Sequence, residues 1–199
     1  MRIGFGVLGL VAVVGGPVRG YGVAGYSLPN EFGYFTIQSN ALGVGVLLLG
    51  GLLDPLGRRW QLVRGASTLY LVITGIVDAA LATHLETGVE PSWIGDVLHR
   101  VMPIVMIVDW VFVPVVLGVS GKLIAGWLVY PIVYCAYTLV RGPMVNWYPY
   151  PFIDPRGQGY LSMTIGLVVL AVAFTLLALA IAALGDMSKR WQTSDELIG

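Results

Sequence analysis

The sequence predicts an all-α integral membrane protein, a bundle of six transmembrane helices forming a single domain over residues 1–199. Hydrophobic residues make up 57% of the chain and charged residues only 11%, whereas a soluble domain carries about 25% charged residues. The mean hydropathy is +0.82. The apolar residues gather into runs of about 20, the length that a helix needs to cross a bilayer. The expected spans lie near 3–26, 31–53, 61–84, 92–118, 124–141 and 159–184.

Turn-forming segments separate these spans. The first span follows Arg2, and "GGPVRGYG" follows it in place of a small-residue cleavage site, so we expect a mature helix rather than a signal peptide. The segment "DPLGRR" divides the second span from the third, and Pro91 precedes the fourth. "LGVSGK" divides the fourth from the fifth, and "NWYPYPFIDPRGQG" precedes the sixth. The sixth run, "GLVVLAVAFTLLALAIAAL", has almost no polar residue and is typical of a lipid-facing or packing helix.

Basic residues predict the orientation. Six spans place both termini on one side, and that side holds Arg2, Arg58, Arg59, Arg64, Lys122, Lys189 and Arg190. The other side holds Arg19, Arg100, Arg141 and Arg156. Because cytoplasmic loops carry the excess of Lys and Arg, both termini are expected in the cytoplasm of a multi-pass protein of the cell (plasma) membrane.

Composition also limits the function. Eleven basic residues balance eleven acidic ones, so nothing predicts a nucleic-acid partner. The single Cys135 cannot form an intrachain disulfide. Two histidines are too few for a three-histidine metal site, and no H-E-x-x-H spacing occurs, so we expect no metal. The oligomeric state is not predicted.

Polar residues of three spans are expected at one depth. With helices starting at Asn30 and Ser92, Thr36 lies about 8 Å and His99 about 10 Å below the outer helix ends, at 1.5 Å per residue. Asp78 lies about 9 Å before the end of the third span by the same rise. Ionisable groups inside a span are costly and indicate function. We therefore expect a shared pocket that opens toward the outer leaflet.

Helical spacing groups these residues into faces. The predicted faces are Phe32, Thr36, Asn40 and Gly43 on the second span, Tyr70, Thr74 and Asp78 on the third, Asp96, His99, Pro103, Met106 and Trp110 on the fourth, and Tyr130, Tyr134, Tyr137 and Arg141 on the fifth.

Five segments resemble a known family. "YFTIQSN" (34–40), "DVLHRVMP" (96–103), "DW" (109–110), "YPIVYCAYTLVRGP" (130–143) and "WYPYPFIDP" (147–155) are similar to motifs of the bacterial Pr6Pr membrane-protein family, in family order. That family resembles, more distantly, the androgen-induced and androgen-dependent membrane proteins. Those are six-helix threonine hydrolases of fatty acid esters of hydroxy fatty acids. The resemblance implies that Thr36 matches their nucleophile and His99 their essential histidine, whereas Asp96 stands where their pattern has a second histidine.

Thr36 and His99 also suggest chemistry by residue type. A threonine hydroxyl is a weak nucleophile that needs a base within hydrogen-bonding distance, ideally one oriented by a third group. His99 would be the base, with Asp96 or Asp78 as the orienting carboxylate. The alternative is structural: the threonine bonds to the carbonyl four residues earlier, and the histidine faces interfacial water.

The supporting residues leave alternatives open. Asn40 is the side-chain candidate for an oxyanion donor, or it makes an interhelical hydrogen bond worth about 0.6 kcal/mol. Asp78 belongs to the site or pairs with Arg141 or a tyrosine. Asp109 is read as structural, bonded to a tyrosine of the fifth span.

The same faces suggest where a substrate binds. Acyl chains would lie beside Met106 and Trp110, and Tyr134, Tyr137 and Arg141 would contact the rest of the molecule. Arg141 either holds a substrate carboxylate or extends to the membrane interface. The aromatic residues within 146–159 form an interfacial belt, or the loop acts as a lid.

The predicted function is hydrolysis of a membrane lipid ester by Thr36 and His99, without a cofactor. Two other classes stay open. One is a non-catalytic lipid or small-ligand binding membrane protein with the pocket but no activated hydroxyl. The other is a small transporter, for which Pro103 and Pro114 would break the fourth span, although no internal repeat occurs.

Overall fold

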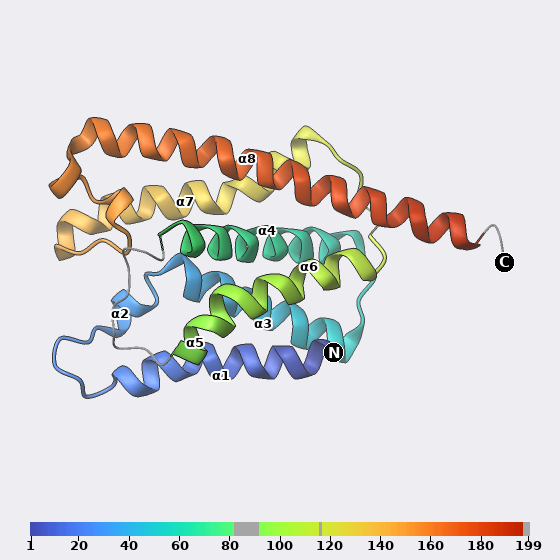
Figure 1. The fold of residues 1–199 in the computed structure, drawn as a ribbon, viewed down its shortest axis with the longest axis horizontal. Helices are drawn as coiled ribbons and strands as arrows, with labels where there is room; N and C mark the ends of the chain where they lie inside the picture. Colours follow the sequence, from blue (N-terminus) through green and yellow to red (C-terminus); the bar gives the residue numbers. More distant parts are fainter. Residues whose placement is uncertain (82–91, 116, 197–199) are drawn as a thin grey trace.

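The computed structural model describes residues 1–81, 92–115 and 117–196, and all regular structure in this part of the chain is helical (Figure 1). Five described helices, α1, α3, α4, α7 and α8, are long and apolar enough to cross a membrane, as in a multi-pass membrane protein. The elements are α1 (Arg2–Gly20), α2 (Leu28–Glu31), α3 (Phe35–Leu53), α4 (Arg58–Leu81), α5 (Ser92–Asp96), η1 (Val97–Val101), α6 (Met102–Phe112), α7 (Gly121–Val145), η2 (Pro151–Ile153) and α8 (Pro155–Glu196).

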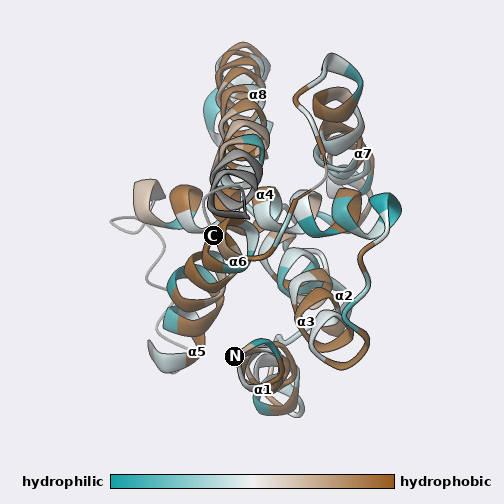
Figure 2. Ribbon diagram, turned by 90° about the vertical axis from the view of Figure 1, so that its right-hand side faces the viewer, coloured by the Kyte–Doolittle hydropathy of each residue, from teal (hydrophilic) through white to brown (hydrophobic). Residues whose placement is uncertain are grey.

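Helix α4 forms the centre of the bundle. Viewed along the bundle, α7 and α8 lie on one side of α4, and α3 and α1 lie on the other (Figure 2). The most apolar window of α4 is 61% buried, whereas that of α8 is 17% buried. The apolar surface of α8 therefore faces outward. The start of α1 and the end of α8 lie at the same end of the bundle, which we call the terminal end (Figure 1). The opposite end is called the cavity end.

The first two spans are shorter than predicted. Helix α1 ends at Gly20 rather than near residue 26, and α3 begins at Phe35 rather than near residue 31. Asn30 does not cap α3, because it lies in the single turn of α2, where its carbonyl accepts the N–H of Gly33. Tyr34 then adopts an extended backbone (φ −75°, ψ 133°). Thr36 consequently lies in the first turn of α3, not deeper in a longer helix.

The fourth expected span is interrupted and also shorter. It consists of α5, η1 and α6 and ends at Phe112 rather than near residue 118. Val113 is extended (φ −101°, ψ 131°), because a residue before proline, here Pro114, is disfavoured in the helical region. The predicted end of the third span, at residues 82–84, lies outside the described residues.

Segment η1 is a π-helix that contains His99. The N–H of Met102 bonds to the carbonyl of Val97, five residues earlier. Pro103 has no N–H with which to reach the carbonyl of His99 four residues before it, so one α-helical hydrogen bond is missing directly after this turn. Single π-helical turns are rare and often occur at functional sites.

The terminal end is closed by an ion-pair cluster of Arg2, Arg64 and Asp109. The Arg2 Nε lies 2.5 Å from one Asp109 oxygen, and the Arg64 Nε lies 3.4 Å from the other. Arg2 also bonds to Asp54 and to the Gly50 carbonyl, both at 3.0 Å. Asp109 thus pairs with two arginines rather than with a tyrosine of the fifth span, because a buried carboxylate requires opposite charge.

Candidate active site

A cavity of about 1040 Å³ occupies the cavity end of the bundle. Thr36, Asp78, His99 and Tyr150 line it, together with apolar residues of α7 and α8. Several lining residues are also solvent-exposed, among them Ile132 of α7 at 65%. Its lining therefore includes exposed apolar side chains, and its volume lies slightly above the usual range for ligand pockets, about 300–1,000 Å³.

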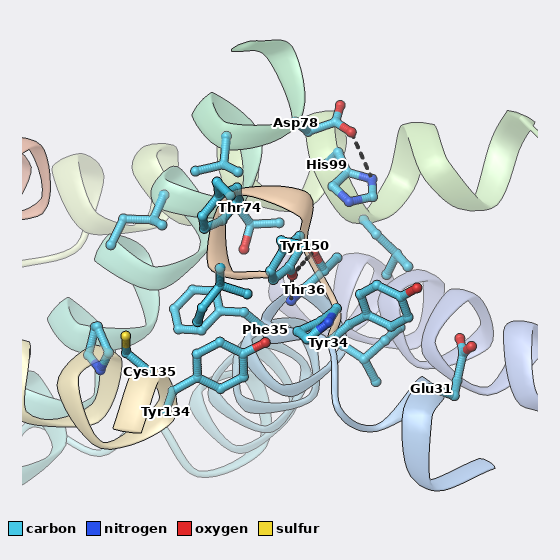
Figure 3. A pocket seen from close by; sticks show the side chains of 18 of the residues that line it. Glu31, Tyr34, Phe35, Thr36, Thr74, Asp78, His99, Tyr134, Cys135 and Tyr150 are labelled. Carbon is cyan, nitrogen blue, oxygen red and sulfur yellow. Dashed lines mark hydrogen bonds and ion pairs between the residues drawn. The ribbon is translucent and has the colours of Figure 1, made fainter. Parts of the chain in front are cut away.

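The Thr36 hydroxyl contacts Tyr150. The Tyr150 hydroxyl lies 3.4 Å from the Thr36 Oγ1 and accepts the Thr36 backbone N–H, also at 3.4 Å. Figure 3 shows this contact in the middle of the pocket, with His99 and Asp78 to one side. The N–H groups in the first turn of a helix have no partner within the helix. The phenol of Tyr150 therefore supplies a partner that α3 itself lacks.

His99 faces Asp78 of the neighbouring helix α4. Its Nδ1 lies 3.1 Å from the Gly95 carbonyl and 3.9 Å from an Asp78 carboxylate oxygen. A carbonyl oxygen only accepts hydrogen bonds, so Nδ1 is assigned the hydrogen. The Nε2 atom then retains the lone pair that a general base requires.

Neighbouring helices position the His99 turn from two sides. The Asn40 amide nitrogen donates to the Thr36 carbonyl at 2.9 Å and to the carbonyl of Leu98, next to His99, at 3.1 Å. Asn40 is fully buried. On the other side, a Cβ atom added to Gly75 of α4 would lie 2.8 Å from the His99 carbonyl oxygen. Only glycine allows α4 to approach η1 this closely, which brings Asp78, one turn further along α4, to His99.

The remaining predicted carboxylate lies apart from this group. Asp96, at the end of α5, pairs with Arg100 of η1 on the exposed surface. The sequence leaves Asp96 and Asp78 as alternative groups to orient His99, and Asp78 is the one that His99 contacts.

Of the five residues predicted to bind substrate, only Tyr134 lines the cavity. Tyr134 lines the cavity and donates to the Gly33 carbonyl at 2.8 Å. Tyr137 is 53% exposed, and Arg141 bonds to Asn30 at 2.6 Å and lies over the Trp147 ring. None of the cavity-lining residues is Tyr137, Arg141, Met106 or Trp110. Met106 and Trp110 are packed in the core, where the Trp110 indole donates to the Ile181 carbonyl at 2.8 Å.

The described residues thus bring a hydroxyl, an imidazole, a carboxylate and a phenol to one cavity. No family model, curated protein or solved structure matches this chain. Support for a function therefore comes from the chemistry of these four side chains and from the apolar surroundings of the cavity.

Tyr150 is the site residue that sequence analysis missed. It was included only in a belt of loop aromatics, because the loop has no helical period to show which ring points inward. The one available signal was its position between Pro149 and Pro151, which restricts the backbone.

Proposed function

We propose that this chain is an intramembrane hydrolase of lipid esters, with Thr36 as the nucleophile, His99 as the base and Asp78 as the group that orients His99. One observation carries the proposal: Thr36, His99 and Asp78 line a single cavity together with apolar residues of α7 and α8. Such a cavity is suited to a substrate that arrives from within the bilayer. The resemblance of five segments to the Pr6Pr family, and through it to threonine hydrolases, agrees with the same roles.

The reaction would begin with attack by the Thr36 oxygen on the ester carbonyl carbon. His99 Nε2 takes the hydroxyl proton, and the imidazolium that forms is stabilised by Asp78. When the tetrahedral intermediate collapses, the bond to the alcohol oxygen breaks and His99 returns the proton to that oxygen. Water then attacks the acyl carbon while His99 takes a proton from it, and His99 returns that proton to the Thr36 oxygen as the bond between this oxygen and the acyl carbon breaks.

The contact partner of the Thr36 hydroxyl is Tyr150, and no hydrogen bond joins the hydroxyl to His99 among the residues that the structure describes. Catalytic hydrogen bonds are often long or misaligned until substrate is bound. Asn40 ties the two turns together through the carbonyls of Thr36 and Leu98, which keeps the turn that carries the nucleophile next to the turn that carries the base.

The acyl chain would lie between α7 and α8. Leu139 of α7 and Leu167, Leu170 and Phe174 of α8 line this part of the cavity. This location replaces the one beside Met106 and Trp110, since both of those residues are enclosed in the core. An apolar passage between two helices lets the chain remain in a hydrocarbon environment throughout binding.

The segment from α5 to α6 is long enough to cross a membrane. Segments α5, η1 and α6 together run from Ser92 to Phe112, about 31 Å at helical rise, which matches a hydrocarbon core of about 30 Å. We propose that this rod is a sixth crossing. With both termini in the cytoplasm, as the positive-inside rule favours, the cavity would lie in the outer leaflet of the plasma membrane.

Two variants test the function. Purified protein would be assayed against a panel of lipid esters and with a fluorophosphonate probe. Thr36→Val should reduce turnover by at least about 10³-fold and abolish labelling, and His99→Gln should reduce turnover by about 10²–10⁴-fold. Thr74→Val is the matched control, because Thr74 lines the same cavity but its hydroxyl bonds back to the Tyr70 carbonyl.

A lipid-binding protein without catalysis is the second candidate, favoured by the contact of the Thr36 hydroxyl with Tyr150 instead of His99. It predicts that lipid binds the purified protein while esters stay intact and Thr36 stays unlabelled. If esters are hydrolysed equally by wild type, Thr36→Val and His99→Gln, the assignment of the site is wrong.

A further inference from the structure

Ester hydrolysis through Thr36 needs hydrogen-bond donors for the carbonyl oxygen that gains negative charge. Asn40, the side-chain candidate from the sequence, is not available for this role. Its amide nitrogen already donates to two backbone carbonyls, and its side chain is fully buried outside the cavity lining. The donors must therefore come from other groups beside the Thr36 oxygen.

Tyr150 has a donor in the required position. Its hydroxyl is 3.4 Å from the Thr36 Oγ1 and 3.4 Å from the Thr36 backbone nitrogen. Both contacts are longer than the 2.7–3.2 Å typical of strong hydrogen bonds, so a substrate oxygen can displace them at small cost. The first turn of α3 also contributes the positive end of its helix dipole.

The ring of Tyr150 is held firmly in this position. It stacks on Phe152 with ring centroids 5.2 Å apart and meets the edge of Tyr34 at 5.8 Å. The short helix η2 follows directly. A ring fixed by two neighbours keeps its hydroxyl aimed without further loss of conformational entropy.

Burial also keeps the phenol protonated. It raises the pKa of Tyr150 above its ordinary value, because the charged phenolate is poorly solvated there. A protonated phenol donates a hydrogen bond but does not remove a proton. The hydroxyl is thus suited to stabilising an oxyanion, and the role of base stays with His99.

We propose that Tyr150 is a catalytic residue whose hydroxyl, together with the Thr36 backbone N–H, forms the oxyanion hole of the site. This inference rests on the proposed function. As the bond between the Thr36 oxygen and the carbonyl carbon forms, the π-electron pair moves to the carbonyl oxygen. That oxygen accepts hydrogen bonds from the Tyr150 O–H and the Thr36 N–H. When the carbonyl re-forms, the pair returns, the alcohol leaves with the proton from His99, and Tyr150 keeps its own proton throughout.

The test compares two tyrosines of one loop. Tyr150→Phe removes the hydroxyl and keeps the ring, and Tyr148→Phe is the matched control because the Tyr148 ring lies under the Arg156 guanidinium and does not line the cavity. We expect Tyr150→Phe to lower kcat by about 10²-fold, as for loss of one oxyanion donor, with KM changed less than about 2-fold. Thermal unfolding in detergent should be similar for both variants and wild type.

Fluorophosphonate labelling gives a second measurement that does not require the natural substrate. The phosphoryl oxygen of the probe occupies the place of the oxyanion, so the rate of Thr36 labelling should also fall by about 10²-fold in Tyr150→Phe. Tyr148→Phe should label at the wild-type rate.

The outcomes separate the two proposals. If Tyr150→Phe retains wild-type kcat and labelling while Thr36→Val is inactive, the oxyanion role is overturned and the hydrolase function stands. A higher KM with unchanged kcat also overturns the role, because Tyr150 would then bind only the ground state. If wild type neither hydrolyses esters nor reacts with the probe, both proposals fail.

Discussion

At the terminal end of the bundle, the carboxylate of Asp109 contacts two guanidinium groups, whereas at the cavity end the carboxylate of Asp78 lies 3.9 Å from a single imidazole nitrogen. The side chain of Asp109 is 1% exposed and that of Asp78 is 34% exposed. Helix α4 and the α5–η1–α6 segment contribute to both groups, and α1 adds Arg2 at the terminal end. A buried carboxylate that pairs with two arginines fixes helices to one another, whereas Asp78, partly exposed beside the cavity, is the carboxylate that we propose orients His99.

The largest difference between the two ends should appear in stability. Asp109→Asn would leave Arg2 and Arg64 without their shared counter-charge, which should cost about 3–5 kcal/mol. Asp78→Asn, the matched change at the cavity end, should cost less than about 1 kcal/mol because the pair is partly exposed. Thermal unfolding in one detergent measures both. Equal losses would show that the two carboxylates do not differ as described.

The approach of α4 to η1 offers a second way to disturb only the cavity end. Gly75→Ala places a Cβ atom 2.8 Å from the His99 carbonyl oxygen and 3.3 Å from the Pro103 ring, and such overpacking should cost about 1–3 kcal/mol. Ester turnover should fall with it, because Asp78 moves with α4. Gly45→Ala is the control, since a Cβ at Gly45 has no neighbour within 4 Å. A Gly75→Ala protein with wild-type stability and turnover would contradict the close packing.

The smallest effect is expected from Asp96, the exposed carboxylate at the end of α5. Asp96→Asn removes an exposed pair with Arg100, which is worth about 0.3–0.5 kcal/mol, and should change kcat less than about 2-fold. Asp78→Asn should lower kcat by about 10-fold or more, because His99 loses its orienting group. Steady-state kinetics of the two variants decides which carboxylate serves His99, and a larger loss in Asp96→Asn would reverse the assignment.

The long apolar helices were predictable because bilayer thickness fixes their length and composition. The runs that contain α1, α3, α4, α7 and α8 were recognised from hydropathy alone, although their ends differ by several residues. The breaks in the fourth span fall beside Pro103 and Pro114, the two residues that the sequence marks as possible breaks. The break at α2 was not predicted, because Asn30 suggested a cap, whereas Asn30 and Gly33 of this turn bond to Arg141 and Tyr134 of α7.

Side-chain directions were predicted less well on the fourth span. The rule that places His99, Met106 and Trp110 on one face assumes 3.6 residues per turn. The π-helical turn at η1 contains more residues per turn, so the residues after Val101 point in different directions from those expected. Asp109 and Arg2, 107 positions apart in the chain, form a contact that no local pattern indicates.

Cys135 is the only sulfhydryl in the sequence, and it lines the cavity on the α7 side. An environment-sensitive dye attached there would report optically on the arrival and departure of a lipid in the otherwise unaltered chain. No engineered labelling position would be required, and the same reporter would read every variant that leaves this thiol in place.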